Sequence, residues 1–383
     1  MEQSATKKDK KTTKVAVAMS GGVDSSVTAA LLLQEGYDVI GLMQQLWSEP
    51  GREKKKPDGD SEALQLAQKA ADQLRIPFHV IDTRAFFKKE VVGYFLDGYA
   101  RGTTPNPCLM CNRVIRWGNL LDQAVGLGAE YLATGHYARL ERQPGKSVRL
   151  LKGIDAKKDQ SYVLSQLNQK QLQHTLLPLG SYTKSQVRCL AEEHQLPTAH
   201  IKDSQDLCFL AGTDYTSFLK LYMPQVNSPG PIQTLSGEVI GQHNGLAFYT
   251  IGQRKRIKVS SPTPLYVLGK DVNINALIVG GAEELGGDQL QAGCANWVSG
   301  ITPNESFEAE IKIRYTSAFA RGLVTPQGSD RFSVDFEQPL RDITPGQAAV
   351  IYVGEEVVGS GIIEEMGSPT REKPSVNYIE RAK

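Results

Sequence analysis

The segment Ser20-Gly21-Gly22-Val23-Asp24-Ser25-Ser26 restricts this chain of 383 residues more than any other feature. It follows the apolar run Lys14–Met19 and opens a stretch with helical periodicity over residues 23–34. A strand, a glycine turn and a helix in this order expose unpaired backbone N–H groups at the positive end of the helix dipole. The glycines allow phosphate oxygens to approach the backbone closely, so the segment predicts a phosphate-binding loop.

This loop differs from the Walker loop of kinases and GTPases. It lacks the Lys-Ser/Thr ending of that motif, which disfavours both classes. Asp24 is unsuited to a bare phosphate but useful beside a magnesium ion. The segment resembles the PP-loop of ATP pyrophosphatases, which split ATP into AMP and diphosphate. The resemblance implies ATP and Mg²⁺ as ligands.

The first half of the chain alternates predicted strands and helices. Short apolar runs at residues 14–19, 37–43, 78–81 and 130–134 are separated by helical stretches, which predicts an α/β fold with a doubly wound parallel sheet. After about residue 205, short strands and frequent turns predict two small β-rich domains, the last a β-barrel. The predicted units are residues 14–207, 208–282 and 283–368, with flexible tails at 1–13 and 369–383 and a mobile loop at 49–60.

Bulk composition excludes some classes. No apolar run reaches the roughly 20 residues of a membrane span, and the polar first 14 residues lack the apolar core of a secretory signal. Five cysteines do not resemble a secreted disulfide framework, so a cytoplasmic location is expected. The net charge of +1 gives no sign of a nucleic-acid partner.

Cys108 and Cys111 lie in the segment TPNPCLMCNR. Asn112 is a good N-cap for a helix predicted to begin at Arg113, which puts Cys111 just outside the helix N-terminus with Arg113 and Arg116 nearby. Both features stabilise a thiolate, so a lowered pKa is expected for Cys111. Structural zinc or iron binding by the pair is the alternative.

Three further cysteines occur singly. Cys208 lies in the segment DSQDLCF, where the α/β unit is predicted to end. Taken alone it would be a buried core thiol. Cys189 and Cys294 are predicted to be structural thiols of the same kind.

Several longer motifs make a resemblance specific. They are SGGVDSSV, TPNPCLMCNRVIRWGNL, ATGHYAR, KKDQSYVL, KDSQDLCFL, HNGLAFYTIGQRK, YVLGKD and TPGQAAVIY, in this order over nearly the whole chain. The chain is similar to the tRNA 2-thiouridylase family within the PP-loop superfamily. The resemblance implies thiolation of the wobble uridine in tRNAs for Lys, Glu and Gln. A cysteine desulfurase or a sulfur-relay carrier would be the donor.

The same resemblance implies roles for individual residues. Cys208 would carry sulfur as a persulfide, and Cys111 would be the nucleophile that helps to release it through a transient disulfide. ATP phosphates would contact Ala18, Met19, Ser20, Gly21, Gly22, Val23, Asp24 and Ser25, and adenosine would contact Met43 and Gly135. Asn106, Pro107 and Cys108 would face the target base, and other tRNA contacts would be His136, Lys158, Asp159, Gln160, Arg314, Tyr315 and Gln347.

Two departures from the family pattern stand out. Many relatives have Asp at the position of Cys108, where a thiol is a poorer acid or base. With Cys111 and Cys208 it makes three thiols, enough to hold an iron–sulfur cluster with one open iron, so a cluster-dependent thiolase is an alternative to persulfide chemistry. Arg256-Ile257 replaces a Gly-Leu pair, which puts the backbone shape of that loop in question.

Two other functions remain open on the sequence. A nitrogen-transferring PP-loop synthetase would not need the paired thiols. A metal-stabilised RNA-binding protein without catalytic activity would bind zinc and release no diphosphate from ATP.

Overall fold

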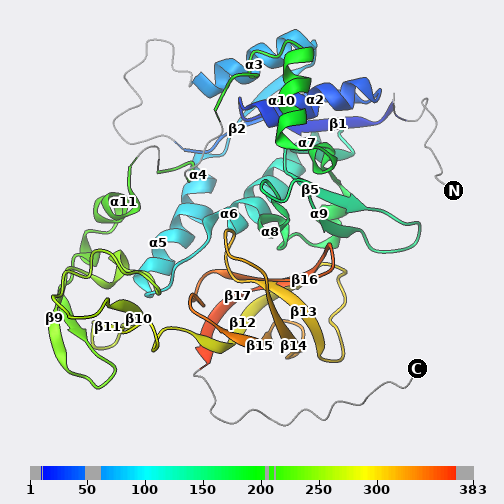
Figure 1. Ribbon diagram of the computed structural model, residues 1–383. Helices are drawn as coiled ribbons and strands as arrows, with labels where there is room; N and C mark the ends of the chain where they lie inside the picture. Colours follow the sequence, from blue (N-terminus) through cyan, green and yellow to red (C-terminus); the bar gives the residue numbers. More distant parts are fainter. Residues whose placement is uncertain (1–9, 11, 48–61, 203–206, 211–212, 368–383) are drawn as a thin grey trace, which may run out of the picture.

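The computed structural model describes residues 10, 12–47, 62–202, 207–210 and 213–367 (Figure 1). The predictions for residues 49–60 and 369–383, and most of that for 1–13, lie outside these residues. Three β-sheets organise the described chain. The parallel sheet and the two β-rich units that follow it confirm the predicted fold class.

The N-terminal sheet has five parallel strands in the order β3-β2-β1-β4-β7. The fifth strand was not predicted, because it contains only two residues. Helices α2, α3 and α10 gather around the sheet in Figure 1. The elements are β1 (Lys14–Ala18), α2 (Val23–Gln34), β2 (Asp38–Gln45), α3 (Glu62–Leu74), β3 (Phe78–Asp82), β4 (Tyr131–Ala133), β7 (Thr175–Leu176) and α10 (Lys184–Glu193).

A helical region between β3 and β4 carries two of the cysteines. It comprises α4 (Arg84–Phe87), a π-helix (Lys88–Val92), α5 (Gly93–Ala100), α6 (Pro107–Met110), a second π-helix (Cys111–Leu120) and α7 (Leu121–Gly126). The short helices α8 (Ser161–Leu164) and α9 (Gln169–Gln173) and a 3₁₀ turn (Pro178–Ser181) follow β4.

The helix that holds Cys111 begins earlier than predicted. The Asn106 side chain accepts a hydrogen bond from the Cys108 amide at 3.1 Å, and Pro107 occupies the first helical position. Proline suits that position because its φ is already helical and its missing N–H would be unpaired there anyway. The predicted N-cap at Asn112 is therefore wrong. Cys108, not Cys111, lies in the first turn.

The C-terminal sheet closes into a six-stranded barrel, because β12 pairs with both β15 and β17. Its strands are β12 (Gly287–Trp297), β13 (Phe307–Lys312), β14 (Ala320–Pro326), β15 (Phe332–Leu340), β16 (Ala348–Val353) and β17 (Glu356–Gly367). A hairpin of β5 (Ala138–Glu141) and β6 (Arg149–Lys152) extends this sheet. The hairpin comes from the N-terminal half of the chain, and the strand pattern did not predict that it would pair with the C-terminal barrel.

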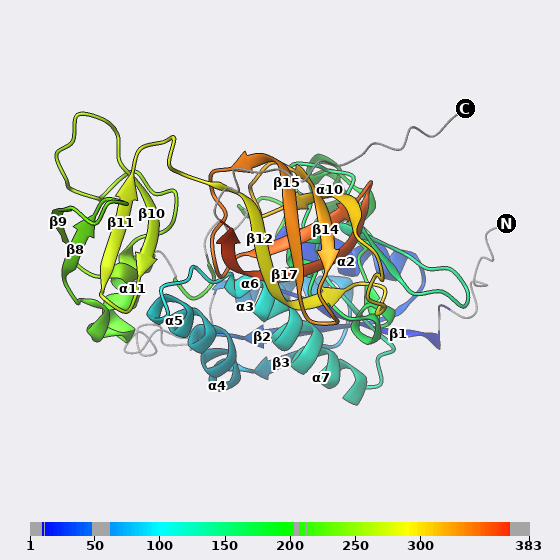
Figure 2. The same ribbon diagram turned by 90° about the horizontal axis from the view of Figure 1, so that it is seen from below.

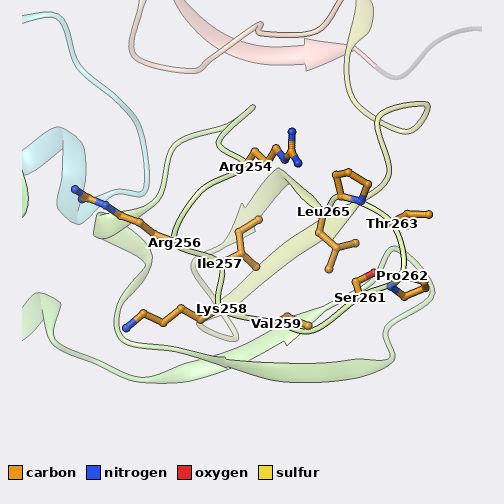
Figure 3. Close-up of a pocket in the computed structure, with 10 residues that line it drawn as sticks. Arg254, Arg256, Ile257, Lys258, Val259, Ser261, Pro262, Thr263 and Leu265 are labelled. Atoms are coloured by element: carbon orange, nitrogen blue, oxygen red, sulfur yellow. The ribbon is translucent and has the colours of Figure 1, made fainter.

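A small mixed sheet of order β10-β11-β8-β9 lies beside the barrel (Figure 2). Its elements are α11 (Tyr215–Tyr222), 3₁₀ turns (Pro224–Val226 and Leu246–Phe248), β8 (Gly230–Gln233), β9 (Val239–His243), β10 (Tyr266–Asp271) and β11 (Ala276–Gly280). The loop before β10 contains Arg256 and Ile257 (Figure 3). Arg256 has φ of 74° and Lys258 has φ of 58°, a conformation that normally favours glycine. The loop thus has two left-handed positions without a glycine at either.

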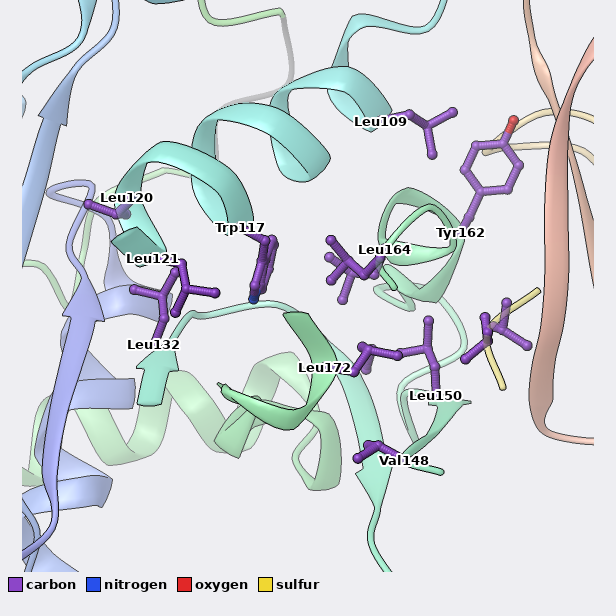
Figure 4. Packing of buried hydrophobic residues seen from close by; sticks show 14 of the residues in the cluster. Leu109, Trp117, Leu120, Leu121, Leu132, Val148, Leu150, Tyr162, Leu164 and Leu172 are labelled. Atoms are coloured by element: carbon purple, nitrogen blue, oxygen red, sulfur yellow. The ribbon is translucent and has the colours of Figure 1, made fainter. Parts of the chain in front are cut away.

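One hydrophobic cluster joins the N-terminal sheet to the barrel (Figure 4). In Figure 4, Trp117 and Leu132 lie toward the N-terminal sheet, Leu164 lies between, and Tyr162 lies toward the barrel. Tyr352 of β16 belongs to the same cluster, and all five side chains are buried. Burying each such side chain contributes about 1.5–3 kcal/mol. The barrel is therefore fixed against the helix that carries the cysteines.

Candidate active site

The phosphate loop lies between β1 and α2, as predicted. Gly21 has φ of 77°, and a Cβ built there would lie 2.2 Å from the carbonyl oxygen of Ala63. Only glycine fits both the backbone conformation and the close approach of α3. Gly22 is the N-cap of α2 and makes no side-chain cap, so the amides of the first turn face the loop.

The three serines have different positions. Ser25 and Ser26 are buried, and their hydroxyls donate to the carbonyl of Gly22 at 3.0 and 3.1 Å. The Ser25 hydroxyl also accepts from the Ser20 amide at 3.1 Å. Ser20 is exposed. Ser25 and Ser26 therefore shape the loop, and Ser20 is the one of the three serines that remains exposed.

Asp24 is held by two residues that sequence reasoning missed. Lys184 Nζ lies 2.8 Å from each of its carboxylate oxygens, and the Tyr137 hydroxyl donates to one of them at 2.6 Å. Lys184 is the first residue of α10, where Thr183 and Gln186 form a capping box. That box is a sequence signal for the helix start, but nothing in the sequence indicates that Lys184 reaches the loop.

The segment after β4 connects the phosphate loop to the cysteines. A Cβ on Gly135 would lie 2.9 Å from Asp24, so its backbone packs directly on the loop. The next residue, His136, is buried, and its Nε2 lies 3.1 Å from an Arg116 guanidinium nitrogen. Arginine only donates, so Nε2 accepts and Nδ1–H donates to the Thr134 hydroxyl at 2.7 Å. Burial, with the charge of Arg116, lowers the pKa of His136 and keeps the ring neutral.

Arg116 also faces three cysteines that the fold brings together. Its charge acts on the thiols of Cys108, Cys111 and Cys208, and these thiols interact electrostatically with one another. All three are free thiols. Cys208 thus lies within electrostatic range of a pair nearly 100 positions earlier in the chain.

The expected lowering of the Cys111 pKa is wrong. Burial raises the pKa of Cys111 to about 12, and Arg116 opposes this only in part. Cys108 and Cys208 keep open surface, yet the surrounding protein removes enough water to raise their pKa values too, that of Cys108 to about 11. The prediction failed because Cys111 lies inside the helix, and because Arg113 reaches toward Gln166, at 3.5 Å, instead of the thiols.

Phe209 anchors the turn that presents Cys208. Its ring is buried, with the centroid 5.1 Å from Phe95, 5.2 Å from Phe218 and 6.4 Å from Trp47. Edge-on aromatic contacts of this kind stabilise beyond simple burial. A buried ring beside an exposed thiol fixes the turn on one side and leaves Cys208 accessible on the other.

Two further expectations about cysteines were tested. Cys189 and Cys294 are exposed, so neither is the buried structural thiol that was predicted. Within the described ranges, no group of three or more His, Cys, Asp or Glu residues is arranged to hold a metal ion. The three thiols around Arg116 thus do not form a ligand set for an iron–sulfur cluster in this conformation.

The residues predicted to contact RNA lie in two groups. The first surrounds the cysteine helix: Asn106 is its N-cap, and Gln347 Nε2 donates to the Thr104 carbonyl at 2.8 Å. The exposed Tyr315 interacts electrostatically with Asp159 and Cys108. Arg314 is within 3.5 Å of Asp342 and donates to the Ile251 carbonyl at 3.3 Å. Residues of the barrel unit therefore contact the segment that leads into the cysteine helix.

The second group follows the phosphate loop. His136 is buried, Asp159 accepts from the amides of Gly153 and Ser161, and Gln160 accepts from the Tyr137 amide at 3.0 Å. Lys158 extends the turn with its amide bonded to the Asp155 carbonyl. These side chains hold the segment that carries Tyr137, and their contacts with RNA stay predictions.

Three family models match successive parts of the chain. They are the tRNA methyl transferase HUP domain over residues 13–212, the tRNA methyl transferase PRC-barrel domain over 216–281 and the aminomethyltransferase beta-barrel domain over 287–363. The described residues contain no helix with the length and apolar character to cross a membrane.

Full-length relatives are more specific. The chain is 44% identical to tRNA-specific 2-thiouridylase MnmA 1 of Caldanaerobacter subterraneus subsp. tengcongensis, over 92% of this chain and 98% of that one. It is 43% identical to tRNA-specific 2-thiouridylase MnmA of Pelotomaculum thermopropionicum, over 93% and 98%. A solved 4-thiouridine synthetase–RNA complex with bound ATP is 18% identical, with a TM-score of 0.33 over 56% of this chain and 51% of that one. Whole-length identity, the three domain matches and the clustered thiols agree: the chain belongs to the tRNA-specific 2-thiouridylase family.

Proposed function

We propose that this protein catalyses the ATP-dependent 2-thiolation of the wobble uridine in tRNAs for Lys, Glu and Gln, in the cytoplasm, with release of AMP and diphosphate. The observation that carries the proposal is the continuous connection from the phosphate loop through Gly135, His136 and Arg116 to Cys111 and Cys208. It joins a phosphate cradle to a group of reactive sulfurs, which are the two requirements of the chemistry. The names of the relatives support the same assignment.

ATP binds with its phosphates over residues 18–25 and its adenosine beside Met43 and Gly135. The uncapped first turn of α2 supports this role, since its amides have no side-chain partner at the N-cap Gly22. Beside its bonds to Lys184 and Tyr137, the Asp24 carboxylate could offer a further lone pair to Mg²⁺, and the ion would neutralise charge at the phosphates. The uridine O2 attacks the α-phosphorus, diphosphate leaves, and O2 becomes part of a good leaving group.

Sulfur arrives on Cys208 as a persulfide from a cysteine desulfurase or a sulfur-relay carrier. The Cys111 thiolate attacks the Cys208 sulfur, the persulfide S–S bond breaks, and hydrosulfide departs with the electron pair. Hydrosulfide then attacks C2 of the adenylated uridine, and AMP leaves. A Cys111–Cys208 disulfide remains, and an external dithiol reduces it to restore both thiols.

The raised thiol pKa values indicate a resting state in which Cys111 is protected. A thiol with a pKa near 12 is almost wholly protonated at neutral pH, and the thiolate is the nucleophile. Loss of its proton therefore accompanies attack, or follows a change of surroundings when tRNA covers the site. Arg116 is the nearby cation that stabilises the thiolate.

Substrate RNA contacts the site from the barrel side and the cysteine-helix side. Asn106, Pro107 and Cys108 face the target base, and Arg314, Tyr315 and Gln347 lie beside them. The electrostatic contact between Tyr315 and Cys108 and the bond from Gln347 to Thr104 support this arrangement. His136, Lys158, Asp159 and Gln160 complete the proposed set.

The test is a reconstitution with ATP, Mg²⁺, inorganic sulfide and unmodified tRNA transcripts. We expect 2-thiouridine at the wobble position of the three tRNAs, with one AMP per thiouridine measured by nucleoside mass spectrometry and nucleotide chromatography. A transcript with cytidine at that position is the control. Diphosphate release with no thiouridine under any sulfur source would contradict the proposal.

Cys208→Ala separates the sulfur routes. With a persulfide donor this variant should make no product, while it still forms adenylated tRNA. Full turnover by Cys208→Ala would contradict the persulfide role. Iron and acid-labile sulfide bound in proportion to active protein after anaerobic purification would favour the cluster-dependent alternative.

A further inference from the structure

The loop before β10 carries a concentration of charge that the proposed chemistry does not use. Arg254, Lys255, Arg256 and Lys258 occupy four of five consecutive positions, and all four are exposed. Arg254, Arg256 and Lys258, with residues 261–265, line a cavity of about 330 Å³ (Figure 3). The cavity opens on the central sheet unit and is separate from the cysteines.

These cations have no ionic partner in the described part of the chain. Other arginines of the molecule do: Arg149 pairs with Glu141 and Glu356, and Arg331 pairs with Glu364. The chain contains 42 acidic residues against 43 basic ones, so the missing partners reflect placement and not a shortage of acids.

The backbone holds this arrangement in an unfavourable shape. Arg256 and Lys258 both adopt positive φ, which brings Cβ too close to neighbouring backbone atoms. Between them Ile257 is buried in the apolar cluster beneath the central sheet, so the loop is anchored in place. Two strained positions in an anchored loop are typical of a functional site.

The loop begins where the central unit meets the barrel. The Ile251 carbonyl accepts from Arg314 at 3.3 Å, and a Cβ on Gly252 would lie 2.6 Å from Asp342. At the other side, Arg256 is close enough to Tyr215 of α11 to lower its hydroxyl pKa against the effect of burial. The loop therefore lies between the barrel residues Arg314 and Asp342 on one side and α11 on the other.

We propose that Arg254, Arg256 and Lys258 form a phosphate-binding site for the backbone of the substrate RNA, away from the target base. Arginine binds phosphate oxygens through two parallel N–H groups, and the hydroxyls of Ser261 and Thr263 in the same cavity add donors. The lining of the cavity has exposed cations and hydroxyl donors and contains no carboxylate, which suits a polyanion. Such contacts position RNA without reading its sequence. This inference rests on the proposed function.

The test compares RNA affinity and its salt dependence in three full-length variants. The first is Arg254→Gln/Arg256→Gln/Lys258→Gln. The second is Arg256→Gly/Lys258→Gly, which removes two charges and relieves both strained positions. Its melting temperature reports whether it is folded. The control neutralises three exposed lysines elsewhere: Lys69→Gln/Lys88→Gln/Lys146→Gln.

We expect the triple loop variant to bind tRNA about 10- to 100-fold more weakly near 0.1 M salt, because each phosphate contact changes the slope of log affinity against log salt by about 0.7–0.9. Its slope should fall by about two. The glycine variant should show a smaller loss with an unchanged or higher melting temperature. The control should match the wild type in both quantities.

Thiolation with inorganic sulfide identifies the class of partner. An RNA contact raises KM for tRNA in that assay and leaves KM for ATP unchanged. Equal RNA affinity and salt slope in all proteins, with slower sulfur transfer only from a protein donor, would overturn the proposal in favour of an acidic protein partner. Failure of the wild type to thiolate, with the binding differences intact, would instead count against the proposed function alone.

Discussion

Lys184 and Asp24 are 160 residues apart, and the ammonium of the first lies 2.8 Å from both carboxylate oxygens of the second. The pair keeps a carboxylate neutralised at the entrance of the phosphate loop. Lys184→Met should therefore raise KM for ATP about tenfold, since an unpaired carboxylate repels the phosphates. It should also lower the free energy of unfolding by about 1–3 kcal/mol through the lost charged hydrogen bonds.

Lys184→Arg is the matched control because it keeps the charge. We expect it to recover most of the ATP affinity, measured by calorimetric titration without tRNA. An equal loss of affinity for ATP and for tRNA in Lys184→Met would indicate a general structural defect and would contradict the specific role.

Gly21→Ala should damage the loop by two separate effects. Its φ of 77° is unfavourable for alanine by about 1–2 kcal/mol, and the new methyl would meet the Ala63 carbonyl at 2.2 Å. Gly36→Ala shares only the first effect, with φ of 92° and nothing within 4 Å. Chemical denaturation should rank Gly36→Ala above Gly21→Ala, and only Gly21→Ala should lose ATP binding. Equal stability of the two variants would show that α3 can move away from the new methyl group at little cost, and it would contradict the predicted steric effect.

Alkylation of Cys111 should report its raised pKa. The thiolate is the reactive form, so the rate of iodoacetamide labelling should rise with pH beyond 9 without a plateau, whereas an ordinary thiol levels off near its pKa of about 8.5. The same shift makes folding stability depend on pH. Because the pKa of Cys111 is higher in the folded state than in the unfolded state, its contribution to stability is complete below about pH 8.5 and is lost as the pH rises toward 12. Peptide mapping by mass spectrometry separates the five cysteines. A plateau for Cys111 near pH 8 would contradict the burial of its thiol.

Arg116→Gln should slow the labelling of Cys208, because the guanidinium favours the thiolate. Each unit of pKa increase reduces the thiolate fraction about tenfold at neutral pH, and we expect a several-fold effect. Arg113→Gln is the matched control, since this neighbour on the same helix reaches toward Gln166 instead. Equal labelling rates of Cys208 in the two variants would contradict a specific effect of Arg116 on this thiol.

The sequence predicted the parallel sheet well, because each of its first four strands is a compact apolar run beside a turn. The helix start near the cysteines was predicted wrongly, because both Asn106 and Asn112 are suitable N-cap residues. Asn112 was predicted as the N-cap, yet Asn106 is the N-cap and Pro107 takes the first helical position, so Cys111 lies in the helix interior. Because the helix begins earlier than predicted, Cys111 is buried and its pKa is raised instead of lowered.

Contacts between distant segments were not predictable from one sequence. The sequence around Lys184 does not indicate its contact with Asp24, and the sequence around Phe209 does not indicate its contact with Trp47. Family resemblance supplied the pairing of Cys111 with Cys208, which no spacing or periodicity indicates. Side chains that act through tertiary packing leave no periodic pattern along the chain.

The β5–β6 hairpin has a consequence for how this protein is made. It forms early in synthesis, yet the strand that completes its outer edge, β17, follows about 200 residues later, as the bond from Arg139 to Glu355 shows. Pairing across such a separation is slow because a long loop must close first. On the ribosome the hairpin therefore waits with an open edge, which is a target for chaperones and for aggregation. A nascent chain stalled before residue 356 should be far more sensitive to protease at residues 138–152 than the finished protein.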